Sequence, residues 1–155
     1  MMVQLYGIGG RLSITRPADT TAYLAGDVVG GAQEFKGFAP SGLRVRISYS
    51  TLLVRAAALI SGESNYRLHL YDITPPSALA DNDPWDLPAG DRDNYLGALN
   101  LGTPVDEGAS LWVEAEQAKD ITLQTDSLFV YLETIGAFTP ASETVRNIAL
   151  EGFVR

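Results

Sequence analysis

LRVRISYS, residues 43–50, is the stretch that decides the fold class of this 155-residue chain. Its apolar and polar side chains alternate strictly: Leu43, Val45, Ile47 and Tyr49 against Arg44, Arg46, Ser48 and Ser50. In a β-strand successive side chains point to opposite faces, so this alternation places one set against a core and the other in water. The stretch therefore predicts a half-covered β-strand, with Tyr49 on the buried side.

The same period of two recurs along the chain. It predicts further strands at residues 3–6, 11–15, 22–29, 33–38, 66–70, 111–115, 121–123, 128–132 and 145–150. The run Leu52–Ile60 could form a helix by propensity, but we expect it to continue the strand that residues 48–54 enter already extended. Glycine and proline clusters separate the strands, among them Gly30-Gly31, and they indicate turns.

Roughly nine or ten short strands with turn residues between them indicate an all-β, antiparallel β-sandwich or barrel. We predict a jelly roll, because its two sheets accommodate eight or more strands and one long connection such as residues 74–94. An immunoglobulin-like sandwich and a closed barrel are the alternatives. Residues 1–21 alternate poorly, so we expect an N-terminal arm or edge strand there and a single jelly-roll domain over residues 22–155.

Composition excludes several classes of protein. The chain has no cysteine, which rules out disulfides and thiolate metal sites. No apolar run approaches the roughly 20 residues that a membrane helix needs, and we expect no membrane partner. The first residues lack the basic start, apolar stretch and small-residue cleavage site of a signal peptide.

The net charge of −8 is concentrated in one part of the chain. Residues 81–126 alone carry a charge of −9, whereas residues 1–80 carry +2 and residues 127–155 carry −1. Phosphate contacts need clusters of Lys and Arg, so nucleic acid is not an expected partner. The acidic block suits a basic protein partner, or it serves solubility alone.

The stretch DNDPWDLPAGDRD, residues 81–93, is the most acidic segment. A calcium loop needs six to eight converging oxygens, but Pro84 and Trp85 interrupt the aspartate spacing, and no glutamate follows at the twelfth position. We therefore predict no metal, with an irregular calcium site as the alternative. Aspartate and proline fix turns in long exposed connections. We expect Trp85 and Leu87 to anchor this loop against a sheet and its aspartates to face water.

No catalytic constellation is visible in the sequence. His69 is the single histidine, which excludes multi-histidine zinc and iron sites, and no Gly-x-Ser-x-Gly elbow occurs. Glu114 and Glu116 share one strand face, but alternating glutamates are ordinary on a solvated face. We predict no catalytic residue, no metal, no cofactor and no enzyme. A sugar hydrolase stays as a distant alternative.

Exposed aromatic residues could stack on sugars if several of them faced water on one side. The candidates are Trp85, Trp112, Tyr71, Tyr95 and Tyr131. Trp112 and Tyr131 lie opposite the aliphatic sets of their strands, where a second layer or another subunit could equally cover them. Carbohydrate binding is therefore an alternative to protein docking.

Three stretches carry a family resemblance: ITRPADTTAYLAGDVVG at residues 14–30, YRLHLYDITPPSALADNDPWDLPAGDRDNYLG at 66–97, and LGTPVD at 101–106. Together they resemble small virion structural proteins of tailed bacteriophages, a group that includes capsid decoration or cement proteins. The resemblance implies a location on the outer surface of the phage head and the major capsid protein as partner. It further implies a homo-oligomer, dimer or trimer, and it brings no catalytic residues.

On this hypothesis the protein binds the outer shell and stabilises it by bridging capsid subunits. The arm and the acidic loop are the expected contacts, through Arg11, Arg16, Asp83, Trp85, Asp86, Leu87, Asp91 and Arg92. The alternative is a receptor- or glycan-binding module of a phage tail or head fibre. That alternative predicts that Trp85 and Trp112 share one groove.

Overall fold

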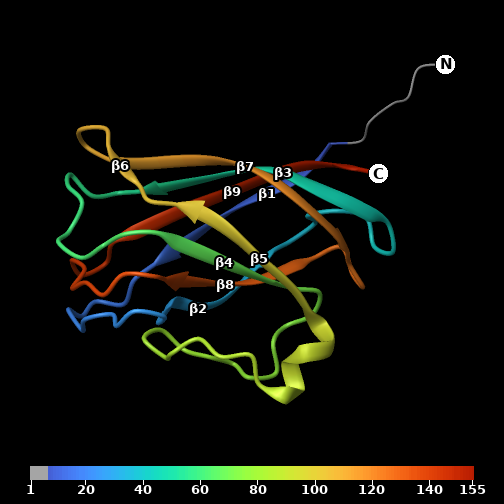
Figure 1. Ribbon diagram of the computed structural model, residues 1–155, viewed down its shortest axis with the longest axis horizontal. Coiled ribbons are helices and arrows are strands. Elements are labelled where there is room, and N and C mark those ends of the chain that lie inside the picture. Colours follow the sequence, from blue (N-terminus) through green and yellow to red (C-terminus); the bar gives the residue numbers. More distant parts are fainter. Residues whose placement is uncertain (1–6) are drawn as a thin grey trace.

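The structure, a computed structural model, describes residues 7–155 as two antiparallel β-sheets packed face to face (Figure 1). Its elements are β1 (Gly7–Thr15), β2 (Val28–Phe35), β3 (Arg44–Val54), β4 (Tyr66–Tyr71), the 3₁₀-helix η1 (Ala89–Asn94), β5 (Tyr95–Gly102), β6 (Val105–Asp106), β7 (Leu111–Thr122), β8 (Leu128–Thr134) and β9 (Val145–Val154). No helix within residues 7–155 is long and apolar enough to cross a membrane.

The strand order identifies a jelly roll. One sheet runs β1-β9-β3-β7-β6 and the other runs β2-β8-β4-β5. Apart from the two-residue β6, the chain changes sheet at every strand except at the β4–β5 hairpin, which gives the two interleaved sets of four strands of this fold. The prediction of an all-β, jelly-roll-like sandwich is confirmed.

The core fills the space between the sheets with the inward half of each alternating strand. Inward side chains of the five-stranded sheet include Val45, Ile47, Leu52, Leu111, Ile148 and Leu150, and those of the four-stranded sheet include Leu68, Leu70, Leu99, Val130 and Leu132. All of them are at most 2% exposed. Their burial stabilises the sandwich by roughly 1.5–3 kcal/mol per side chain before conformational entropy is counted.

A bulge in β3 reverses the predicted position of Tyr49. The pairing of β3 shifts between Ile47 and Tyr49 against both β7 and β9. Val45 and Ile47 are buried before the shift, whereas Ser50, Leu52 and Val54 are buried after it. The prediction that Tyr49 faces the core is therefore wrong, because the extra residue of a bulge moves all following side chains to the other face.

The Gly30-Gly31 pair lies inside a strand, not between two. Residues 28–35 form the single strand β2, whose register against β8 shifts between Val29 and Gln33. Both glycines have positive φ, 84° and 71°, a conformation that other residues adopt at a cost. Of the two strands predicted at residues 22–29 and 33–38, only 28–29 and 33–35 are strand, and they belong to one bulged strand; residues 22–27 and 36–38 lie outside it.

The prediction that Leu52–Ile60 continues the strand holds only as far as Val54. Residues 55–60 form a loop, in which Ala57, Ala58 and Leu59 are exposed. Without a facing layer to cover them, these apolar residues gain nothing from extended pairing. The 3₁₀-helix η1 at the end of the acidic segment was not predicted from the sequence.

The N-terminal segment enters the sheet directly. Gly7–Thr15 form β1, which pairs with the whole length of β9 at the edge of the five-stranded sheet. Residues 16–21 continue as a loop. The strand predicted at residues 3–6 lies outside the described residues, as does the first part of the predicted arm.

The bulge at Gly30 gives a test of this packing. A Cβ at Gly30 would lie 2.1 Å from Ile14 Cγ2, whereas at Gly108, where φ is 96°, nothing lies within 4 Å. Both Gly→Ala changes carry the positive-φ strain of about 1–2 kcal/mol. We expect G30A to lower the free energy of unfolding by at least about 2 kcal/mol more than G108A, as measured by urea denaturation. Equal losses would contradict the close packing of Ile14 on the bulge.

Candidate functional site

The two sheets differ in what covers their outer faces. The connection between β4 and β5, residues 72–94, folds back across the outer face of the four-stranded sheet (Figure 1). As a result β8 is buried on both sides: Tyr131 is as fully enclosed as Val130 and Leu132, and Glu133 is 7% exposed. Among residues 7–155, no comparable segment lies over the outer face of β1, β9, β3 and β7, which we call the open face.

Aromatic and aliphatic side chains hold the connection in place. Leu79, Trp85 and Leu87 pack on a second apolar cluster formed by Val28, Tyr71 and Tyr131, apart from the main core. The Trp85 indole N–H donates to the Tyr71 hydroxyl at 3.2 Å, and the Leu79 amide donates to the Tyr131 hydroxyl at 2.9 Å. Trp85 and Leu87 therefore anchor the loop against the sheet, as the sequence predicted.

His69 lies in a buried polar network beneath this loop. Its Nε2 is 2.6 Å from Glu133 Oε2, and its Nδ1 is 2.9 Å from the Tyr95 hydroxyl. The Trp85 ring stacks on the imidazole at a centroid distance of 3.7 Å. Burial lowers the pKa of His69, although hydrogen bonding to Glu133 opposes that shift. Both ring nitrogens are engaged and the ring is 1% exposed, so His69 is a packing residue with no access to a substrate.

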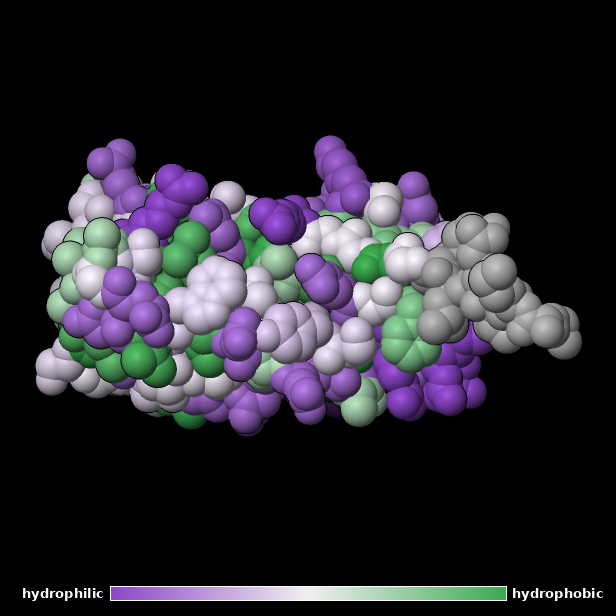
Figure 2. Space-filling model, turned by 90° about the horizontal axis from the view of Figure 1, so that it is seen from above, coloured by the Kyte–Doolittle hydropathy of each residue, from purple (hydrophilic) through white to green (hydrophobic). Residues whose placement is uncertain are grey.

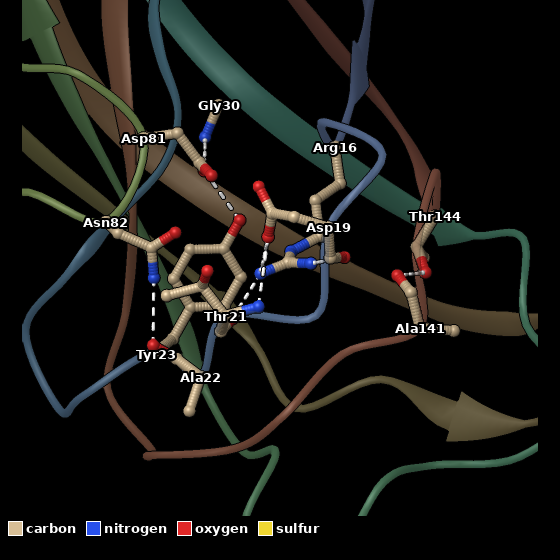
Figure 3. Close-up of polar contacts among 10 residues, drawn as sticks. All are labelled: Arg16, Asp19, Thr21, Ala22, Tyr23, Gly30, Asp81, Asn82, Ala141 and Thr144. Atoms are coloured by element: carbon tan, nitrogen blue, oxygen red, sulfur yellow. Dashed lines mark hydrogen bonds and ion pairs between the residues drawn. The ribbon is translucent and has the colours of Figure 1, made fainter.

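The Asp81 carboxylate joins three separate segments (Figure 3). Its Oδ1 accepts hydrogen bonds from the Tyr23 hydroxyl at 2.6 Å and from the Gly30 amide at 2.7 Å. The neighbouring Asn82 side-chain amide donates to the Ala22 carbonyl at 2.9 Å. The loop is thus bonded to the β2 bulge and to the segment that precedes it.

Several aspartates of the acidic loop satisfy protein groups. Asp91 is fully buried and accepts the Ser77 amide at 3.0 Å, and the Asp83 carboxylate accepts the Ala80 amide at 2.7 Å. Asp81 is bonded as described above. The expectation that all the aspartates face water is wrong for Asp81 and Asp91, because the turns of the loop use their carboxylates as internal acceptors.

The predicted contact residues lie in three different environments. Asp86 and Arg92 are exposed on the loop, whereas Trp85 and Leu87 turn inward to the sheet. Arg11 lies on the open face, on the other side of the sandwich. These residues do not form one site.

Arg16, another predicted contact residue, is an interior group. Its side chain is fully buried, and its guanidinium donates to the Asp19 and Thr21 carbonyls and lies 5.0 Å from the Tyr23 ring centre (Figure 3). Arg16 and the buried Asp91 consequently present no side chain at the surface of this structure.

The open face carries a shallow groove of about 370 Å³. Its lining combines Tyr49, Leu53 and Trp112 with the polar groups of Arg11, Glu114, Asn147 and Glu151. Trp112 is 38% exposed. Figure 2 looks onto this side of the molecule and shows near-neutral surface interspersed with hydrophilic side chains. The bulge in β3 creates the groove, because it turns Tyr49 outward beside Trp112 and Glu114.

One end of the open face is basic. Asp120 accepts hydrogen bonds from Arg46 Nε at 2.6 Å, Arg155 at 2.7 Å and Arg44 at 3.0 Å. The guanidinium groups of Arg46 and Arg155, Arg46 first, hold the pKa of Asp120 well below its usual range. Three cations share one carboxylate, which leaves this end with an excess of positive charge.

The groove presents aromatic and hydrogen-bonding groups side by side. Within residues 7–155, no group of three His, Asp or Glu side chains could hold a metal ion. Hydrogen bonding to Glu114 raises the pKa of Tyr49 to about 12, so the hydroxyl remains a protonated donor at neutral pH. The alternation in the sequence correctly placed Trp112 and Glu114 on one face. It did not predict that Tyr49 lies beside them, because no residue type in the sequence signals the bulge in β3.

Comparison with known proteins gives no family membership. No family model matches the chain, and no curated protein matches it. Among solved structures, a capsid chain of Helicobacter pylori bacteriophage KHP30 is similar at a TM-score of 0.39 and 13% identity, covering 97% of this chain and 93% of that one. The capsid of Ralstonia phage GP4 is similar at a TM-score of 0.41 and 16% identity, covering 98% of this chain and 84% of that one. An adhesin domain of Porphyromonas gingivalis Lys-gingipain is similar at a TM-score of 0.36 and 11% identity, covering 94% of this chain and 74% of that one.

The stack of Trp85 on His69 predicts a pH effect. Because burial lowers the His69 pKa, the unfolded chain binds a proton more readily, and stability should fall as pH drops below about 6.5. The single histidine makes NMR titration unambiguous. We expect W85A to raise the His69 pKa towards 6.5, because it opens the site to water. W112A, which removes the other tryptophan, should leave the pKa unchanged; the same shift in both variants would refute the assignment.

Proposed function

We propose that this chain is a structural protein of a tailed-bacteriophage virion and serves as a decoration or cement protein on the outer head shell. The observation that carries the proposal is the acidic loop, which lies within the longest stretch that resembles such proteins and is fixed on the sheet with charged groups outward. Asp86, Arg92 and Asp93 are exposed on it. A surface held in place before binding loses little conformational entropy on docking.

The proposed partner is a basic region of the major capsid protein. The loop belongs to the segment that carries a charge of −9, and complementary charge steers and orients association. A protein that binds the assembled shell and not its free subunits stabilises the shell by mass action. Copies that contact two capsid subunits add the gain of a high effective concentration.

The test uses phage particles stripped of this protein and then supplied with purified chain. We expect the wild-type chain to rebind and to raise the temperature of genome release. D86N/D93N removes two negative charges from the loop while keeping side chains of the same shape. We expect it to bind at least about tenfold more weakly, as measured by co-sedimentation with the particles.

E107Q/E143Q is the matched control, because it removes two negative charges from exposed positions away from the loop. It should bind as the wild type does. Equal release temperatures for stripped and replenished particles would refute the cement role. Equal weakening by the two double variants would remove the loop from the contact.

A carbohydrate-binding module of a tail or head fibre is the second candidate. The prediction that Trp85 and Trp112 share a groove is wrong, because they lie on opposite outer faces of the sandwich. The groove on the open face nevertheless sets Tyr49 and Trp112 beside Arg11, Asn147 and Glu114, a combination of stacking surface and hydrogen-bonding groups. Titration with host oligosaccharides should then quench the Trp112 fluorescence of W85F, and an unchanged signal at millimolar sugar would dismiss this candidate.

A further inference from the structure

We propose that the open face pairs with the same face of a second copy of this chain, in a two-fold symmetric dimer. The proposal does not depend on a role in the virion. It rests on the sign and position of the charges on this face, on the aromatic groups among them, and on the area available.

The outward charges of the four long strands cancel when Arg155, which follows β9 and bonds to Asp120, is counted with them. The basic groups are Arg11, Arg44, Arg46 and Arg155, and the acidic groups are Glu114, Glu116, Asp120 and Glu151. Lys119 does not belong to this set, because its Nζ turns towards Gly97 in β5. The chain as a whole carries −8, so its remaining surface repels a second copy while this face does not.

The charges are also segregated along the strands. At one end Arg44, Arg46 and Arg155 surround Asp120, an excess of two positive charges. Beyond the β3 bulge, Glu114, Glu116 and Glu151 outnumber Arg11, an excess of two negative charges. Asp120 and Glu114 lie six residues apart on β7, about 20 Å. This separation exceeds the screening length of about 8 Å at physiological salt, so the two regions act as distinct patches.

A two-fold axis that lies in the plane of the contact and across the strands brings the basic end of each copy over the acidic region of the other. Both contacts form at once, since a two-fold interface uses the same surface on both subunits. Tyr49, Leu53 and Trp112 lie within this surface and supply the apolar and aromatic contacts that dominate such interfaces.

The area is sufficient for a stable contact. Four strands of 9 to 12 residues form the face. At about 4.8 Å between strands and 3.3 Å per residue they cover roughly 600 Å² in projection. A standard interface buries about 800 Å² of accessible surface per partner, and accessible surface exceeds its projection.

Two charge-reversed variants test the pairing. In E114K/E116K the acidic region becomes basic, and in R44E/R155E the basic end becomes acidic. Each variant alone sets like charges against each other, so each should dissociate at least about tenfold more readily than the wild type in sedimentation equilibrium. An equimolar mixture of the two should recover a heterodimer, because Lys then faces Glu at one contact and Arg faces Glu at the other.

The outcomes separate the alternatives. A wild type that stays monomeric up to about 1 mM, forms trimers, or pairs equally well in both variants would overturn the proposal. So would a mixture of folded variants that fails to associate. If circular dichroism shows that R44E/R155E is unfolded, R155E replaces it, since Arg155 follows the last residue of β9. Because these changes lie away from the acidic loop, failure of pairing and failure of particle binding are measured independently.

Discussion

The Asp81 carboxylate is the contact on which the asymmetry of this molecule depends. It accepts the Tyr23 hydroxyl and the Gly30 amide, and so bonds the long β4–β5 connection to the bulged edge strand β2. Three backbone hydrogen bonds join the same two segments: the amides of Val28, Asn82 and Trp85 donate to the carbonyls of Asp83, Val28 and Gly26, respectively. With the connection fixed there, Trp85 covers His69 and the outer face of the four-stranded sheet is closed. Within residues 7–155, no segment covers the other outer face in this way.

Two stretches that were singled out in the sequence meet in the structure. The first two resembling stretches, residues 14–30 and 66–97, are far apart in the chain but meet at Asp81, Tyr23 and Gly30 (Figure 3). The guanidinium of Arg16, within the first stretch, lies over the Tyr23 ring at 5.0 Å from its centre. Residues of both stretches therefore build the loop and hold it in place. Asp81, Asp91, Trp85 and Leu87 maintain the shape of the loop through internal contacts. The exposed charges of Asp86, Arg92 and Asp93 are available to a partner.

The sequence was sufficient for the fold and insufficient for the surfaces, and the reasons are specific. Alternation in β7, and in β3 up to Ile47, determined which residues enter the core, because a sheet with one buried face enforces a period of two. The bulge before Tyr49 shifts β3 by one residue against β9, and the bulge at Gly30-Gly31 shifts β2 by two residues against β8. The pairing partners that reveal both bulges are distant in the chain. Likewise, Arg16 and Asp91 have the residue types of a surface. Their burial depends on backbone carbonyls and amides that only the folded loops present to them.

The two proposed surfaces have complementary consequences when they are considered together. The acidic loop covers one side of the sandwich and the open face forms the other, so a dimer joined through its open faces carries its two loops on opposite sides. In the proposed cement role, a pair seated between two neighbouring capsid subunits would contact one of them through each loop. Once one loop has bound, the rigid pair holds the second loop near its partner at a high effective concentration. Two individually weak electrostatic contacts then give stronger binding overall without additional interface area. Pairing would also bury Tyr49 and Trp112, and a protein that bridges subunits in this way cannot use the same groove for a sugar. Pairing through the open face and carbohydrate binding in its groove are consequently mutually exclusive.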